Sequence, residues 1–162
     1  MEKLSPHITL AEATFSNTAK RKGIKNNPTD EHLGNMLTVA EMIFEPLRKY
    51  VGGPIKITSF YRSPELNEAI GGAYKMVDGQ KVQTSQHTRG QAIDIDDVYG
   101  YKSNAEMYKF IKENLDFDQL IWEFGTDINP SWVHVSYVDA QQNRKRCLKA
   151  YKDNGRTKYM VI

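Results

Sequence analysis

Apolar residues recur every three or four positions between residues 33 and 47, which is the spacing of a helix with one buried face. The pattern follows an acidic first turn, Thr29-Asp30-Glu31, and its apolar positions are Leu33, Met36, Leu37, Ala40, Ile43, Phe44 and Leu47. Pro46 lies within it and is expected to kink or end the helix, because proline has no backbone N–H to donate.

Three shorter helices are predicted from their first residues. Thr9 and Ser103 each precede a glutamate by three positions, the capping-box spacing that satisfies the free amides of a helix start. The first of these helices should end near Ser16, and residues 17–28 are interpreted as a polar, basic connection. Ser63-Pro64 supplies a cap and a first helical residue for a helix closed by Gly71-Gly72.

Four segments have the β-branched and aromatic content of strands: 55–61, 92–96, 119–124 and 132–138, the last two joined as a hairpin. Residues 73–84 are polar and aperiodic and are predicted to form an active-site flap. The order of elements predicts an α+β fold with a mostly antiparallel sheet and helices packed on one face.

Composition narrows the class of protein. A chain of 162 residues with 40% hydrophobic content predicts one domain, residues 1–162. A net charge of +2 gives no reason to expect a nucleic acid or a membrane as partner, and the locally basic tail, residues 144–158, is interpreted as a solvated surface. Cys147 is the only cysteine, so an intrachain disulfide and a cysteine-rich zinc site are excluded.

The first ten residues lack the apolar stretch of a signal peptide, and no segment is long and apolar enough for membrane insertion. We therefore expect a protein made in the cytoplasm without an export signal of its own. We expect it to act as a monomer.

Candidate metal ligands lie on two of the predicted strands and on a nearby loop. In the strand 92–96 the alternation places Asp94 on the face opposite two isoleucines, and in the strand 132–138 it does the same for His134. If the chain turns at Gly90, His87 reaches the side of Asp94. Taken singly, each of these residues is as well explained by a structural hydrogen bond, but together they form the mixed nitrogen and oxygen ligand set of a catalytic zinc site with an open position.

The pattern Ser85-x-His87-x-x-Gly90-x-Ala92-x-Asp94, followed by Trp132-x-His134, resembles the metal-binding signature of the zinc D-alanyl-D-alanine carboxypeptidase family. That family of peptidoglycan peptidases includes phage endolysins and L-alanyl-D-glutamate endopeptidases, and it shares its fold with the Hedgehog signalling domain. Upstream, Ser59-Phe60-Tyr61-Arg62-Ser63-Pro64 is similar to the family's Ser-x-Tyr-Arg-Ser-Pro segment. The resemblance covers residues 55–138, about half of the chain.

The resemblance implies zinc as cofactor, held by His87, Asp94 and His134. It implies that Arg62 binds substrate and polarises its carbonyl, and that Ser85 hydrogen-bonds substrate near the metal. In many relatives a catalytic acid or imidazole stands three residues before the last ligand, but that position is Ser131 here, and a serine hydroxyl is too weak a base near neutral pH. Glu123 is the preferred replacement, with Asp96 and Asp127 left open.

The function that follows is a zinc peptidase that cleaves peptidoglycan stem peptides, as a D-Ala-D-Ala carboxypeptidase or an L-Ala-D-Glu endopeptidase. Glu123 takes a proton from the attacking water, and zinc and Arg62 stabilise the oxyanion. By family analogy it acts at the bacterial cell wall after release, as phage or prophage lysis enzymes do. The alternative is a zinc-bearing wall-binding or virion structural module that lost its base.

Trp122 and Trp132 are interpreted as core residues.

Overall fold

A mixed six-stranded sheet organises the molecule. The computed structural model describes all residues from 1 to 162. The strand order is β10 (Arg156–Val161), β9 (Arg146–Asp153), β7 (Gln119–Glu123), β8 (Trp132–Ser136), β6 (Ala92–Asp96) and β3 (Lys56–Ser59). Neighbouring strands are antiparallel except β7 and β9, which are parallel. The predicted α+β class with a mostly antiparallel sheet is therefore confirmed.

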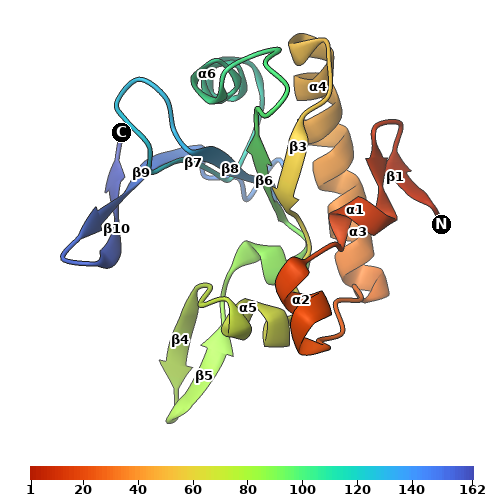
Figure 1. The fold of residues 1–162 in the computed structure, drawn as a ribbon, viewed down its shortest axis with the longest axis vertical. Helices are drawn as coiled ribbons and strands as arrows, with labels where there is room; N and C mark the ends of the chain where they lie inside the picture. The colour runs from red at the N-terminus through yellow and green to blue at the C-terminus, as the bar shows by residue number, and fades with distance from the viewer.

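The hydrophobic core lies between this sheet and four helical segments: α3 (Asp30–Val39), η1 (Ala40–Phe44), α4 (Glu45–Val51) and α6 (Asn104–Asn114). Figure 1 shows α3 and α4 along one side of the sheet and α6 beside them. Fully buried side chains of these helices, such as Met36, Ile43 and Met107, contact the same cluster as Ile93 and Val135 of the sheet. The helices therefore cover one face of the sheet and leave the other face, which carries Asp94 and His134, uncovered by helices.

The alternation in the two central strands has the expected phase. Ile93 and Ile95 of β6 are fully buried in the core, as are Val133 and Val135 of β8. Asp94 and His134 lie between these pairs, are direct partners in the antiparallel ladder, and point to the opposite face. Burial of the aliphatic residues thus determines where the polar pair must lie.

The predicted helix starts are confirmed by the caps. The hydroxyls of Thr9, Ser63 and Ser103 each accept a hydrogen bond from the backbone N–H three residues on. They cap α1 (Leu10–Ala13), α5 (Pro64–Ala69) and α6. Each cap satisfies an amide that has no partner within its helix.

Pro46 does not end the long helix, contrary to one of the two expected outcomes. Ahead of it the chain widens into the π-helical segment η1, in which the Glu45 N–H bonds the Ala40 carbonyl five residues back. Because Pro46 has no N–H to donate, the wider turn accommodates it, and α4 continues to Val51.

The N-terminal region holds more structure than the sequence predicted. Residues 17–28 are not a plain connection, since helix α2 (Asn17–Lys22) begins at the Ser16 cap and ends at Gly23 with a left-handed φ of 66°. Two short strands, β1 (Lys3–Ser5) and β2 (Ile8–Thr9), precede α1. The polar composition of α2 hid it, because its only buried residue is Ala19.

The interpretation of residues 144–158 as a solvated tail is wrong for its first half. Strand β9 is part of the main sheet, and Cys147, Leu148 and Ala150 are buried. Basic residues are interspersed among these positions, so the segment is hydrophilic on average although three of the eight side chains of β9 are buried. Strand β10 has no buried residue and matches the prediction of a solvated surface.

Residues 73–84, expected to be an irregular flap, form the hairpin of β4 (Tyr74–Val77) and β5 (Gln80–Gln83). Figure 1 shows it projecting from the body of the molecule beside α5. Its side chains are mostly exposed, which explains why no buried-face periodicity marks it in the sequence.

No helix of the molecule is long and apolar enough to cross a membrane.

Gly90 connects the short 3-10 helix η2 (Gln86–Arg89) to β6 with a φ of +71°. A Cβ added at Gly90 would lie 2.5 Å from the His32 carbonyl oxygen of α3. Gly23 has a similar φ of +66°, but a Cβ there meets nothing within 4 Å. Alanine at Gly23 would therefore introduce backbone strain alone, whereas alanine at Gly90 would introduce both backbone strain and steric overlap.

We expect Gly90→Ala to lower the free energy of unfolding by about 2–4 kcal/mol, since left-handed strain and overpacking add. Gly23→Ala should cost about 1 kcal/mol from strain alone. Urea unfolding of both variants measures the difference. Equal decreases in the free energy of unfolding would contradict close packing of the η2 turn against α3.

Candidate active site

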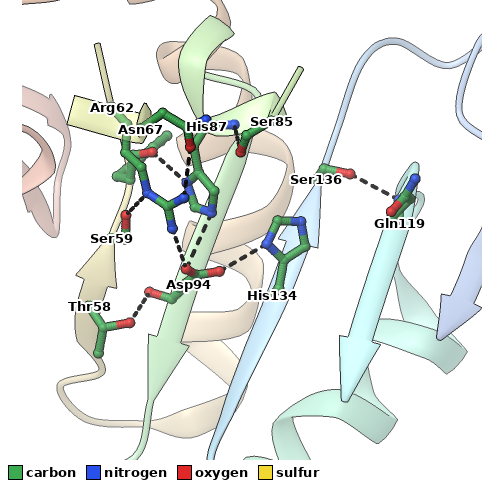
Figure 2. A network of polar contacts seen from close by, with 11 residues as sticks. Thr58, Ser59, Arg62, Asn67, Ser85, His87, Asp94, Gln119, His134 and Ser136 are labelled. Carbon is green, nitrogen blue, oxygen red and sulfur yellow. Dashed lines mark hydrogen bonds and ion pairs between the residues drawn. The ribbon is translucent and has the colours of Figure 1, made fainter. Parts of the chain in front are cut away.

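Three side chains meet on the polar face of the sheet. Asp94 comes from β6, His134 from β8 and His87 from η2, and one ligand atom of each lies within 4.8 Å of the others. Figure 2 shows both imidazoles directed at the Asp94 carboxylate, with Arg62 reaching it beside His87. The structure therefore brings together the three residues that the sequence singled out as metal ligands.

A backbone contact sets the tautomer of His87. Its Nδ1 lies 2.7 Å from the Phe60 carbonyl oxygen, which can only accept, so Nδ1 carries the proton. The lone pair of a neutral ring then belongs to Nε2. This atom is buried, makes no hydrogen bond, and lies 3.3 Å from Oδ2 of Asp94.

Burial keeps His87 neutral and Asp94 remains charged. Burial lowers the pKa of His87, and this effect outweighs the attraction of the Asp94 carboxylate. Burial alone would raise the pKa of Asp94, but the hydrogen bond from His134 holds it well below its usual range. A neutral imidazole lone pair and a carboxylate oxygen face one another with no proton between them, and a divalent cation satisfies both atoms.

His134 completes the group. Its Nδ1 lies 2.9 Å from Oδ1 of Asp94, so the two imidazoles approach the two different oxygens of one carboxylate. The rings of His87 and His134 are edge to face, with centroids 5.1 Å apart. Two imidazoles and one carboxylate fit a zinc ion, which prefers nitrogen and oxygen ligands of this kind.

Arg62 lies at the same carboxylate without being a metal ligand. Its guanidinium donates to Ser59 Oγ at 3.0 Å, to Asn67 Oδ1 at 3.2 Å and to Asp94 Oδ2 at 3.4 Å. Figure 2 shows the guanidinium between β3 and Asp94. These contacts hold a positive charge beside the cluster, where a developing oxyanion can use it. Asn67, fixed by Gln83 and the Ala73 carbonyl, is a supporting residue that the sequence analysis did not identify.

Ser85 caps the turn that carries His87. Its Oγ accepts the His87 N–H at 3.3 Å, and Ser85 also lines the cleft in front of the cluster. A contact between Ser85 and substrate stays a prediction. The structure adds that this serine positions a candidate ligand.

Glu123 is the candidate base that lines the same cleft as the three candidate metal ligands. The cleft has a volume of about 830 Å³, and Glu123 shares it with His87, Asp94 and His134. Burial and the nearby Asp94 carboxylate raise the pKa of Glu123 to about 7, against the attraction of His134 and Arg62. A carboxyl group with this pKa can both accept and return a proton near neutral pH.

The two competitors are engaged elsewhere. Asp96 Oδ1 accepts a hydrogen bond of 2.7 Å from Asn104, which also bonds the Pro130 and Ser131 carbonyls. Asp127 is exposed and pairs with Lys149, outside the cleft. These contacts favour Glu123 among the three carboxylates that the sequence left open.

Trp132 is not a core residue as predicted. It is half-buried, lies beside Glu123 in the ladder of β7 and β8, and lines the cleft. Trp122 points to the other face and packs against the core, as predicted. The phase of β8 decides the difference, because Trp132 shares the face of His134.

Comparison with known proteins supports one family. A family model described as Peptidase M15 matches residues 6–136, about four fifths of the chain. A search of the curated proteins finds no match. The matched region contains the whole cluster together with Arg62 and Glu123, and it ends before β9.

The cluster predicts one divalent metal ion per chain. We expect zinc-loaded parent protein to retain about one equivalent after gel filtration and Asp94→Ala to retain almost none, because the variant removes the shared carboxylate. Asp96→Ala, a matched control on the same strand, should keep its zinc. Metal analysis by mass spectrometry measures the zinc content of all three proteins. Loss of zinc in Asp96→Ala but not in Asp94→Ala would show that Asp96, and not Asp94, is the ligand.

Burial of Glu123 also predicts a pH-dependent cost to the metal-free protein. Because its folded pKa is raised to about 7 from 4.5, its contribution to stability is present below pH 4.5 and is lost as the pH rises through 7. Glu123→Gln stays neutral, so this variant should be more stable than the parent by about 1–3 kcal/mol at pH 8 and equally stable at pH 4.5.

Denaturant unfolding in the presence of chelator at both pH values measures this difference. Asp127→Asn is the control, since the pKa of that exposed carboxyl is lowered by Lys149 and its removal should bring no gain at pH 8. A Glu123→Gln protein that is less stable than the parent at pH 8 would show that the carboxylate is well solvated.

Proposed function

Because the chain belongs to the peptidase M15 family, we propose that it is a zinc peptidase that hydrolyses peptidoglycan stem peptides, as a D-Ala-D-Ala carboxypeptidase or an L-Ala-D-Glu endopeptidase. One observation carries the proposal: a single cleft holds three candidate metal ligands, His87, Asp94 and His134, together with the buried Glu123 carboxyl group, whose pKa is about 7. A metal site with such a base has the parts needed for hydrolysis.

The chain's own residues divide into holders and actors. His87, Asp94 and His134 would hold zinc, and Phe60 and Ser85 keep His87 in its tautomer and position. When bound, zinc supplies a Lewis acid that polarises a carbonyl and lowers the pKa of water. Arg62 supplies a fixed positive charge for the oxygen of the scissile carbonyl.

Glu123 handles the proton. Ionised Glu123 accepts a proton from water as the water oxygen forms a bond to the scissile carbonyl carbon. The protonated carboxyl group then returns this proton to the amide nitrogen as the C–N bond breaks, which leaves a carboxylic acid and an amine. The raised pKa of Glu123 suits both halves of this cycle, since neither form of the group is strongly disfavoured at pH 7.

This role for Glu123 also weighs against a non-catalytic wall-binding or virion module. That alternative drew support from Ser131, which replaces the usual acid of the family pattern. Ser131 is exposed, and its backbone N–H bonds the Glu123 carbonyl at 2.9 Å. A base on β7, the strand adjacent to β8, would take the place of the family position, so the loss of that position need not remove catalysis.

Purified sacculi and synthetic stem peptides test the proposal. The zinc-loaded parent should release peptides or amino acids that mass spectrometry identifies, and chelator should stop the release. Glu123→Gln should keep its zinc and lose turnover by roughly two to four orders of magnitude, because it keeps the shape but removes the proton acceptor. Asp127→Asn, which removes an exposed carboxylate outside the cleft, should retain parent activity.

Two outcomes would contradict the proposal. A parent protein that binds sacculi with zinc present but releases nothing would favour the wall-binding module. A Glu123→Gln protein that hydrolyses at the parent rate would transfer the role of base to another group.

A further inference from the structure

The C-terminal hairpin, strands β9 and β10, forms one end of the cleft. Its cleft-lining residues are Arg146, Leu148, Lys152, Thr157 and Tyr159. All of them lie beyond residue 136, where the family match ends. This end of the cleft therefore lies outside the matched region, and its chemistry bears on what this chain selects.

Ladder register places the hairpin on the face of the metal cluster. Ile121 of β7 is paired with His134 on one side and with Leu148 on the other, and Glu123 is paired with Ala150. Directly paired residues point to the same face of a sheet. The positions two apart on β9 therefore share the face of Glu123 and His134, and these are Arg146, Leu148, Ala150 and Lys152.

The floor between these positions is apolar. Ile121, Leu148 and Ala150 are buried and form a small cluster separate from the main core. Tyr159 pairs with Ala150 and stands at the edge of this floor. Tyr159 is 55% exposed, and its partial burial raises the pKa of its hydroxyl; the Glu123 and Asp94 carboxylates raise it further, as expected for a side chain that faces the cluster. A peptide crossing the cleft would rest on this surface.

Arg146 is the uncommitted cation at this end. Its neighbour Arg144 is occupied, because it donates to both carboxylate oxygens of buried Asp118 at 2.9 and 2.7 Å. Lys152 donates to the Thr157 hydroxyl and lies over the Phe124 ring. The exposed Arg146 guanidinium has no hydrogen bond or ion pair, and the hairpin offers the cleft no carboxylate.

The distance from the cluster relates Arg146 to the cleaved bond. It pairs with Gln119, two residues before the position that pairs with His134, and β9 lies two strands from β8. Strands are about 4.8 Å apart and residues about 3.3 Å, so Arg146 lies roughly 12 Å from His134 along the sheet. An extended peptide covers this distance in three to four residues.

We propose that the C-terminal hairpin is a substrate subsite in which Arg146 binds a free carboxylate of the peptide, about three residues from the cleaved bond, while the apolar floor carries the chain between. The planar guanidinium fork matches a carboxylate with two parallel hydrogen bonds. This inference rests on the proposed function for the identity of the substrate, and it names carboxylate-bearing peptides as the preferred class.

Peptide binding without turnover provides the test. Zinc-loaded Glu123→Gln protein is titrated calorimetrically with a synthetic stem peptide that has all its carboxyl groups free, and with versions in which one carboxyl group at a time is amidated. Arg146→Gln is added to this background. The matched control is Arg156→Gln, which removes an exposed arginine from the same hairpin on its opposite face.

We expect Arg146→Gln to raise the Kd for the free peptide about tenfold to a hundredfold, as for the loss of a charge-assisted pair. Arg146→Lys should lose part of the affinity and Arg156→Gln none. One amidated peptide should bind the Arg146-containing protein as weakly as the free peptide binds the variant, and it should be indifferent to Arg146→Gln.

The inference is overturned if Arg146→Gln leaves the Kd unchanged, if it weakens all the peptides equally, or if no peptide binds. These results differ from failure of the proposed function. If the protein hydrolyses sacculi equally well with and without Arg146, only the subsite proposal is contradicted. If peptide binding depends on Arg146 but the parent protein hydrolyses nothing, only the proposed peptidase function is contradicted.

Discussion

A buried imidazole lone pair facing a buried carboxylate is the constraint on which the site depends. His87 Nε2 and Asp94 Oδ2 are 3.3 Å apart without a hydrogen bond, and the Phe60 carbonyl holds the ring proton on the other nitrogen. Such an arrangement is costly in a protein interior unless a cation lies between the two groups. The surrounding contacts serve to maintain it: Gly90 lets the η2 turn approach α3, and Ser85 caps that turn.

The sheet separates the two tasks of the molecule by face. One face packs aliphatic residues against α3, α4 and α6, and this packing fixes the register that aligns Asp94 with His134. The other face carries the cluster, the Glu123 carboxyl group and an apolar floor that continues into β9. Burial in this cleft lowers the pKa of His87 and raises that of Glu123, so a single physical effect prepares both a ligand and a base.

Strict alternation made the central site predictable from sequence. Isoleucines on both sides of Asp94 and valines on both sides of His134 leave only one face for the polar residues. Trp132 was assigned to the core because it is large and apolar, although the same phase places it on the His134 face. Glu123 was preferred from strand phase alone, and its burial in the cleft of the cluster could only come from the structure.

The C-terminal hairpin was missed for a different reason. Arg146, Lys149 and Lys152 make the segment hydrophilic on average, and only the ladder with β7 shows that Cys147, Leu148 and Ala150 are covered. The helix α2 and the hairpin of β4 and β5 were missed because few of their side chains are buried. Patterns of burial predict elements well where an element has a dry face, and poorly where it has none.

The central claim is that a cation belongs between His87, Asp94 and His134. Anomalous diffraction at the zinc absorption edge, from crystals grown with one equivalent of zinc, tests it most directly. We expect one strong peak between His87 Nε2, the Asp94 carboxylate and the His134 imidazole. A map with no peak there, with zinc bound only elsewhere or with a water hydrogen-bonded to His87 Nε2 in its place, would contradict it.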